Sequence, residues 1–139
     1  MRSMDTTRQK HILIVDDSLD QQLLLKTVLE ARGYTTECTS NGEEALSILR
    51  SSKVMPQTIL LDLNMPIMGG LDFFQLKQQD ESLRSIPVVL MSGENSVELT
   101  HDFGLSEVVA KPLTISRVID AIERHKMSDD LNFTRDFTH

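Results

Sequence analysis

Five short strand-like runs alternate with amphipathic stretches along the chain, and this alternation limits the fold more than any other feature of the sequence. Four of the runs are apolar, the second (Tyr-Thr-Thr-Glu-Cys) is a weaker signal, and all five are too short for helices, so each is predicted to form a strand. They occupy residues 11–15, 34–38, 58–61, 86–91 and 107–110. Strands that alternate with helices favour a parallel sheet covered on both faces, with right-handed crossovers. The sequence therefore predicts an α/β fold, a single doubly wound five-stranded parallel sheet in the order 2-1-3-4-5.

The stretches between these runs carry the signals of helices. Apolar residues at helical spacing precede Gly33, which is expected to end the first helix in a left-handed conformation. Residues 40–43, Ser-Asn-Gly-Glu, have the form of a capping box, which opens a second helix. A third helix is expected over residues 71–79, and Thr114 is expected to cap the last one.

Composition narrows the classes of partner. The 139 residues carry 14 Lys and Arg against 21 Asp and Glu, a formal net charge of −7. This balance argues against direct binding to nucleic acid, which needs a positive surface. No apolar run reaches the roughly 20 residues that span a membrane, so no membrane partner is expected. The single cysteine, Cys38, excludes an internal disulfide and fits a cytoplasmic protein.

Polar side chains stand at the predicted carboxyl ends of four strands. Asp16 and Asp17 follow the first strand, Asp62 the third, Ser92 the fourth and Lys111 the fifth. Parallel strands end at the same edge of a sheet, and ligands bind at that edge where the winding reverses. These side chains are therefore predicted to converge on one site.

The residue types at this edge suit one kind of chemistry. Three neighbouring carboxylates repel one another, and a single lysine cannot balance them. An all-oxygen site of this kind is what Mg2+ prefers, with several of its waters retained. A carboxylate nucleophile, a metal ion, a lysine and a hydroxyl donor are also the parts that phosphoryl transfer uses. Each residue also has an ordinary interpretation, such as a helix cap for Asp17 or a surface charge for Lys111, but their placement on corresponding strand ends favours a site.

The same residues carry a resemblance to a known family. The segments ILIVDD, ILLDLNMPIMGG, VVLMSG and VVAKP, in this order and spacing, resemble the receiver domain of two-component response regulators, of the stand-alone chemotaxis-receiver kind. The resemblance covers residues 10–126, with residues 1–9 as an N-terminal extension and 127–139 as a C-terminal tail. It implies a flavodoxin-like fold and a phosphorylation switch. The phosphoryl group comes from a histidine kinase or a histidine phosphotransfer protein, and the output is a contact with a downstream protein.

The resemblance also implies which residues bind the metal and which residue accepts the phosphoryl group. Asp62 is the implied phosphoacceptor. Asp16 and Asp17 are implied to organise Mg2+, with Asp17 and Asp62 as direct ligands and the backbone carbonyl of Asn64 as a third. A protein of this kind catalyses only its own phosphorylation and dephosphorylation.

Four further residues receive implied roles. Lys111 bonds Asp62 or its phosphate, ahead of a cis peptide to Pro112, and a proline at this position makes the cis bond accessible. Ser92 bonds a phosphoryl oxygen. Asn64 and Glu94, each two residues past a site residue, tune hydrolysis of the acyl phosphate.

Two departures from the family pattern concern the usual output face. Val108 stands three residues before Lys111, where receivers usually carry Tyr or Phe. Ser92 and Lys111 are 19 positions apart (111 − 92), which is shorter than usual by about one helical turn. The fourth helix, within residues 95–103, is therefore expected to be short or irregular.

Two other functions compete with a phosphorylation switch. Asp-Leu-Asn at residues 62–64 faintly resembles the Asp-x-Asp of aspartyl-nucleophile phosphatases, but Asn64 cannot replace the aspartate that those enzymes use as a general acid. A pseudo-receiver would keep the fold as a binding module without phosphorylation. Val108 favours that alternative, and the intact set of site residues argues against it.

Overall fold

Five parallel strands form one sheet in a computed structural model that describes residues 10–93 and 107–125. The order is β2-β1-β3-β4-β5, so the predicted topology is confirmed. The strands are β1 (His11–Val15), β2 (Thr35–Thr39), β3 (Thr58–Asp62), β4 (Val88–Ser92) and β5 (Glu107–Ala110). The helices are α2 (Leu19–Ala31), α3 (Gly42–Ser51), α4 (Gly70–Gln79) and α6 (Ile115–His125).

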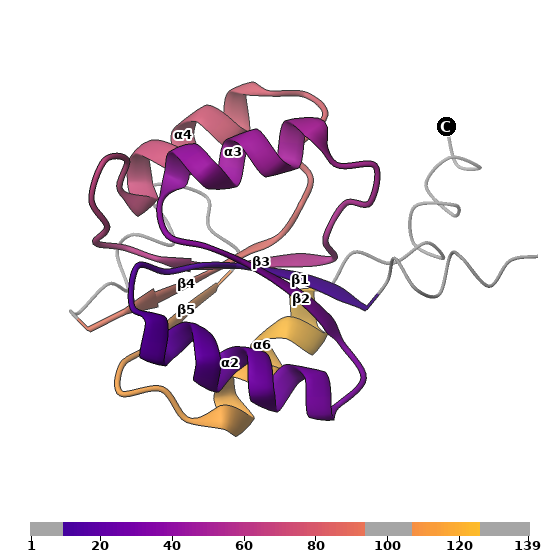
Figure 1. Ribbon diagram of the computed structural model, residues 1–139, viewed down its shortest axis with the longest axis vertical. Helices are drawn as coiled ribbons and strands as arrows, with labels where there is room; N and C mark the ends of the chain where they lie inside the picture. The colour runs from indigo at the N-terminus through magenta and orange to yellow at the C-terminus, as the bar shows by residue number, and fades with distance from the viewer. Residues whose placement is uncertain (1–9, 94–106, 126–139) are drawn as a thin grey trace, which may run out of the picture.

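Helices cover both faces of the sheet. In Figure 1, α3 and α4 lie above the sheet, and α2 and α6 lie below it. Successive strand residues point to opposite faces. In β3, Ile59 and Leu61 pack with α3 and α4, whereas Leu60 packs with α2 and α6. All five residues of β3 are buried, which confirms the prediction of a strand enclosed on both faces.

The end of α2 follows the prediction. Gly33 has φ +94°, and its N–H donates to the Glu30 carbonyl. The N–H of Tyr34 donates to the Leu29 carbonyl. This pair of bonds is a Schellman motif, which satisfies carbonyls that the helix leaves open and turns the chain into β2.

The start of α3 differs from the prediction by one residue. Asn41, not Ser40, is the N-cap, and its Oδ1 accepts a bond of 2.9 Å from the Glu44 N–H. Glu44, not Glu43, reaches back, and its Oε1 accepts from the Ser40 N–H at 2.9 Å. Asparagine caps a helix as well as serine does, so sequence alone did not separate the two registers.

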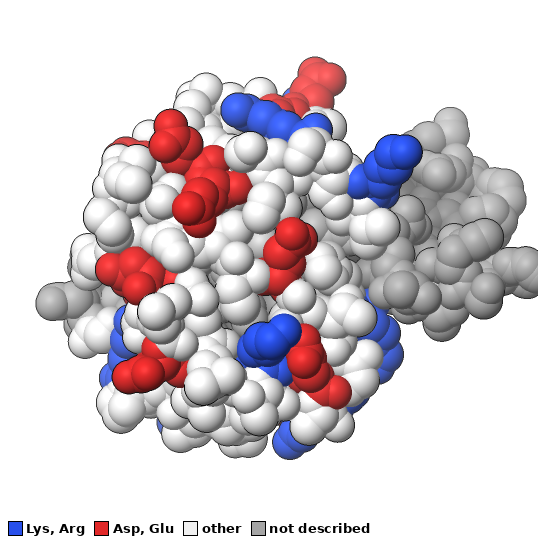
Figure 2. Space-filling model, in the orientation of Figure 1, with Lys and Arg blue, Asp and Glu red and all other residues white. Residues whose placement is uncertain are grey.

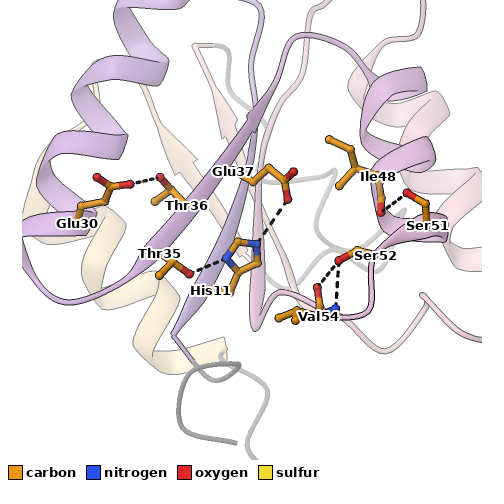
Figure 3. A network of polar contacts seen from close by, with 9 residues as sticks. All are labelled: His11, Glu30, Thr35, Thr36, Glu37, Ile48, Ser51, Ser52 and Val54. Atoms are coloured by element: carbon orange, nitrogen blue, oxygen red, sulfur yellow. Dashed lines mark hydrogen bonds and ion pairs between the residues drawn. The ribbon is translucent and has the colours of Figure 1, made fainter. Parts of the chain in front are cut away.

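Polar side chains join the amino ends of β1 and β2 (Figure 3). The Nδ1 of His11 lies 2.7 Å from Thr35 Oγ1, and its Nε2 lies 3.7 Å from Glu37 Oε1. Thr36 Oγ1 donates to Glu30 Oε2 on α2 at 2.9 Å. These contacts tie the edge strand β2 to β1 on one side and to α2 on the other.

The described surface agrees with the acidic composition. On the face seen in Figure 2, Lys and Arg side chains lie apart from one another among acidic and neutral ones. None of the helices in residues 10–93 and 107–125 has both the length and the apolar character needed to cross a membrane.

Candidate functional site

The carboxyl edge of the sheet brings the predicted acidic residues together. Asp16 and Asp17 directly follow β1, and Asp62 is the last residue of β3, the neighbouring strand. One carboxylate oxygen from each of the three lies within 4.8 Å of the others. Asp16 and Asp62 are buried, whereas Asp17 is exposed. The cluster therefore has two enclosed carboxylates and one that faces solvent.

Asp62 lies beneath this edge with a lysine beside it. Asp62 is 5% exposed, and its Oδ1 accepts a hydrogen bond of 2.9 Å from Lys111 Nζ. The chain after Asp62 turns tightly against the start of α4, where the Gly70 N–H donates to the Leu63 carbonyl at 2.9 Å. A Cβ at Gly70 would meet the Asp62 carbonyl oxygen at 2.4 Å, so this approach requires glycine.

Asp16 is the most enclosed member of the cluster. It is 1% exposed, and its Oδ1 accepts a bond of 2.9 Å from the Ser18 N–H. Burial raises the pKa of Asp16. The Ser18 bond and Lys111 lower it, while the negative charges of Asp62 and Asp17 add to the increase. The ionised form of Asp16 is therefore destabilised in the folded protein, and a nearby positive charge would reduce this destabilisation.

The donor set fits a hard divalent cation. The Oδ2 of Asp16 is buried and has no hydrogen-bond partner among the described residues. This oxygen belongs to a cluster in which all the ligand atoms are carboxylate oxygens, the type that Mg2+ prefers. The exposed Asp17 leaves the cluster open to solvent, so an ion bound there can keep several of its waters.

Ser92 and Lys111 come from the two strands on the other side of Asp62. Ser92 is the last residue of β4 and is 2% exposed. Its carbonyl accepts a bond of 2.8 Å from the Lys111 N–H, so the backbones of the two residues are joined. The peptide bond between Lys111 and Pro112 is cis. The hydroxyl and the ammonium group therefore come from adjacent strand ends.

The loop between Asp62 and α4 contains a feature that the sequence did not predict. Ile67 has φ +66°, a left-handed conformation that β-branched residues rarely adopt, and it is 79% exposed. The flanking Met68 N–H donates to the Pro66 carbonyl at 2.6 Å, and the Met68 carbonyl accepts from the Gly42 N–H at 3.0 Å. The loop that carries Asn64, which is exposed, is therefore anchored to the start of α3.

A second unpredicted residue reaches the site from α2. The side-chain amide of Gln22 donates to the backbone carbonyl of Asp16. A glutamine on a helix has no sequence signal for such a contact, because its partners come from the folded chain.

Two predictions remain open here, since Glu94 and the segment expected to form the fourth helix lie outside the described residues. Val108 is half-buried and packs against the core beneath α3 and α4.

The sequence of residues 12–123 matches the family described as response regulator receiver domain. The chain therefore belongs to this family, and the predicted resemblance is confirmed. The polar-differentiation response regulator DivK of Brucella anthropi is 31% identical over 119 residues, which cover 84% of this chain and 95% of DivK. Brucella ovis DivK has the same identity and coverage.

Solved structures agree with this family and with the fold. The signal receiver domain of a signal transduction histidine kinase from Syntrophus aciditrophicus is 32% identical with a TM-score of 0.76, covering 83% of this chain and 88% of that one. Chemotaxis protein CheY4 of Vibrio cholerae, at 24% identity and a TM-score of 0.75, shares the fold over 83% of this chain and 97% of its own. The flavodoxin-like α/β fold predicted from the sequence is thus confirmed.

Proposed function

We propose that this chain is a phosphorylation switch in which Asp62 accepts a phosphoryl group from a histidine kinase or a histidine phosphotransfer protein. The switch then acts by contact with a downstream protein. One observation carries the proposal: Asp62 lies in an acidic cluster with Asp16 and Asp17, and Lys111 Nζ lies 2.9 Å from its Oδ1. This arrangement holds a nucleophile, a place for a cation and a positive donor in one site.

The chemistry that follows is attack by a carboxylate on phosphorus. An Asp62 oxygen forms a bond to phosphorus, the bond from phosphorus to the donor's leaving group breaks, and that group departs with the electron pair. Lys111 has three N–H donors and can bond a phosphoryl oxygen as well as Asp62. The Ser92 hydroxyl donates to a second phosphoryl oxygen. Both donors act on charge that is present on the transferred group.

The proposed metal ligands are the carboxylates of Asp17 and Asp62 and the backbone carbonyl of Asn64, with Asp16 organising the site. Mg2+ bound there supplies positive charge next to the transferred phosphoryl oxygens. The buried Oδ2 of Asp16, which has no bonded partner among the described residues, supports this assignment. Without a cation the cluster keeps its mutual repulsion.

Hydrolysis resets the proposed switch. Water attacks phosphorus, inorganic phosphate leaves, and the Asp62 carboxylate is restored. Asn64 and Glu94 are proposed to tune this step by positioning the attacking water through their polar side chains. The chain thus catalyses only its own phosphorylation and dephosphorylation.

Radiolabelled acetyl phosphate with Mg2+ tests the proposal. We expect label to accumulate on the wild-type chain and to decay over seconds to minutes. Rapid continuous turnover without accumulation would favour a phosphatase, and no uptake would favour a pseudo-receiver. Asp62→Asn is expected to take up no label, because an amide is not a competent nucleophile at neutral pH. Asp72→Asn, an exposed carboxylate in the first turn of α4, is the matched control and is expected to label normally.

A further inference from the structure

The side chain of Gln22 joins the ends of two strands next to the acidic cluster. Its Nε2 donates to the backbone carbonyl of Asp16 at 2.6 Å and to that of Thr39, the last residue of β2, at 3.2 Å. The Thr39 carbonyl also accepts a bond of 3.0 Å from the Asp16 N–H. One amide group on α2 thus connects the helix, the end of β2 and the residue that follows β1.

The carbonyl that Gln22 holds belongs to the peptide between Asp16 and Asp17. The orientation of this peptide sets the direction in which the backbone of Asp17, and with it the carboxylate, leaves the strand. The other polar groups of Asp16 are placed separately, its N–H by Thr39 and its Oδ1 by Ser18. Among the described contacts, the Gln22 bond is therefore the one that fixes this carbonyl.

We infer that Gln22 is a positioning residue for the cation site. By holding the peptide between Asp16 and Asp17, it orients the Asp17 carboxylate for ligation before an ion arrives. The inference rests on the proposed function for the identity of the ion. Partners that hold metal ligands in place typically contribute 10- to 100-fold to metal affinity, so removing the amide is expected to weaken Mg2+ binding by about 10-fold or more.

Gln21 provides a matched control on the same helix. It has the same side chain one position earlier, but its Nε2 is buried with no hydrogen-bond partner within the described part of the chain. Methionine is close to glutamine in length and flexibility and has no N–H donors. Gln22→Met and Gln21→Met therefore make the same chemical change, and only Gln22→Met removes bonds to the site.

The experiment measures Mg2+ affinity of the full chain without a phosphodonor. Amide shifts of Asp17 and Ser18 are followed by NMR during titration with MgCl2, and urea unfolding without Mg2+ reports stability. We expect the dissociation constant to rise about 10-fold or more in Gln22→Met and to stay within about 2-fold of wild type in Gln21→Met. In metal-free protein, the Asp17 amide shift should change in Gln22→Met and not in Gln21→Met.

Two results would overturn the inference. One is a Gln22→Met protein that is less stable but binds Mg2+ as tightly as wild type, which would make Gln22 a structural residue only. The other is equal weakening in both variants. If Gln22→Met does not fold, Gln22→Asn replaces it, since that amide is one methylene too short to reach both carbonyls. Failure of the proposed function is separate, because it would appear as wild-type protein that binds Mg2+ but takes up no phosphoryl group.

Discussion

Asp16 and Lys77 are each 1% exposed, and their surroundings differ in a way that separates a site from a structural feature. Lys77, in the last turn of α4, donates to Gln78 Oε1 at 2.7 Å and to the Arg84 carbonyl at 3.1 Å. These acceptors are neutral. Asp16 instead lies within a group of like charges that reaches solvent through Asp17.

Burial favours the neutral form of both groups, but only the charge of Asp16 lies where a bound cation could compensate it. Burial lowers the pKa of Lys77 to about 8 and raises the pKa of Asp16. The unfavourable charge of Lys77 is a fixed part of the fold. The unfavourable charge of Asp16 is shared by a cluster open to a cation. A perturbed pKa therefore indicates function only when the geometry offers a ligand a place to bind.

Replacement of Lys77 is expected to produce the largest change in stability. At pH 7 the buried charge disfavours the folded state, because the folded pKa of about 8 lies below the unfolded value of 10.5. Lys77→Met is expected to raise the free energy of unfolding by about 2 kcal/mol in urea titrations at pH 7, because the loss of two hydrogen bonds offsets part of the roughly 3 kcal/mol that corresponds to the lowered pKa. Lys26→Met, which removes an exposed lysine paired with Glu30, should leave it nearly unchanged, because solvent screens an exposed ion pair.

The pH dependence of the free energy of unfolding tests whether the buried charge of Lys77 causes this difference. Between about pH 8 and pH 10.5 the folded wild type releases the Lys77 proton while the unfolded chain keeps it, so this group's contribution to stability rises with pH. The gap between Lys77→Met and wild type should therefore narrow across this window. A gap of constant size from pH 7 to pH 10.5 would show that the buried charge is not its cause.

The Mg2+ response of the acidic cluster is expected to be the next largest effect. Free Mg2+ at about ten times its dissociation constant should stabilise the wild type by about 1.4 kcal/mol, since the ion binds only the folded state. Asp17→Asn should be about 1 kcal/mol more stable than wild type without Mg2+, because repulsion falls, and should lose most of the response. Glu37→Gln, which changes a carboxylate in the middle of β2, should respond as wild type does. Unchanged Mg2+ affinity in Asp17→Asn would contradict direct ligation.

Relief of backbone strain at Ile67, in the loop between β3 and α4, should be the smallest effect. The left-handed φ of Ile67 costs a residue with a Cβ roughly 1 kcal/mol, and its exposed side chain contributes little packing. Ile67→Gly is expected to raise the free energy of unfolding by about 0.5 kcal/mol, after the added entropy of the unfolded chain is subtracted. Ile67→Ala keeps the strain and should leave stability nearly unchanged. Equal stabilisation by both variants would place the cause in the side chain.

The order of the elements and the convergence of the acidic residues were predictable because they depend on local pattern and on topology. Short apolar runs between amphipathic stretches leave few arrangements of a parallel sheet. Once the order 2-1-3-4-5 is accepted, residues that end β1 and β3 must be neighbours. Asp16, Asp17 and Asp62 therefore met as the sequence predicted.

The features that were missed have different physical causes. Lys77 is charged, and charged residues normally face solvent, but it continues the helical spacing of the buried residues Phe73 and Phe74, a signal that could have indicated its burial. The bonds of Gln22 need the ends of β1 and β2 in place. Ile67 opposes its own backbone preference, so local propensity predicts the wrong conformation. The predicted N-cap of α3 was one residue too early, because Ser40 and Asn41 are adjacent and both are good capping residues.

Locating the phosphoryl group on the chain tests the role of Asp62 most directly. Protein phosphorylated by acetyl phosphate and Mg2+ is treated with borohydride, which reduces an aspartyl phosphate to homoserine, and the digested peptides are sequenced by mass spectrometry. Phosphorylation at the proposed nucleophile predicts homoserine at Asp62 alone, and none in Asp62→Asn. Homoserine at Asp16 or Asp17, or a phosphoryl group that persists on Asp62→Asn, would contradict it.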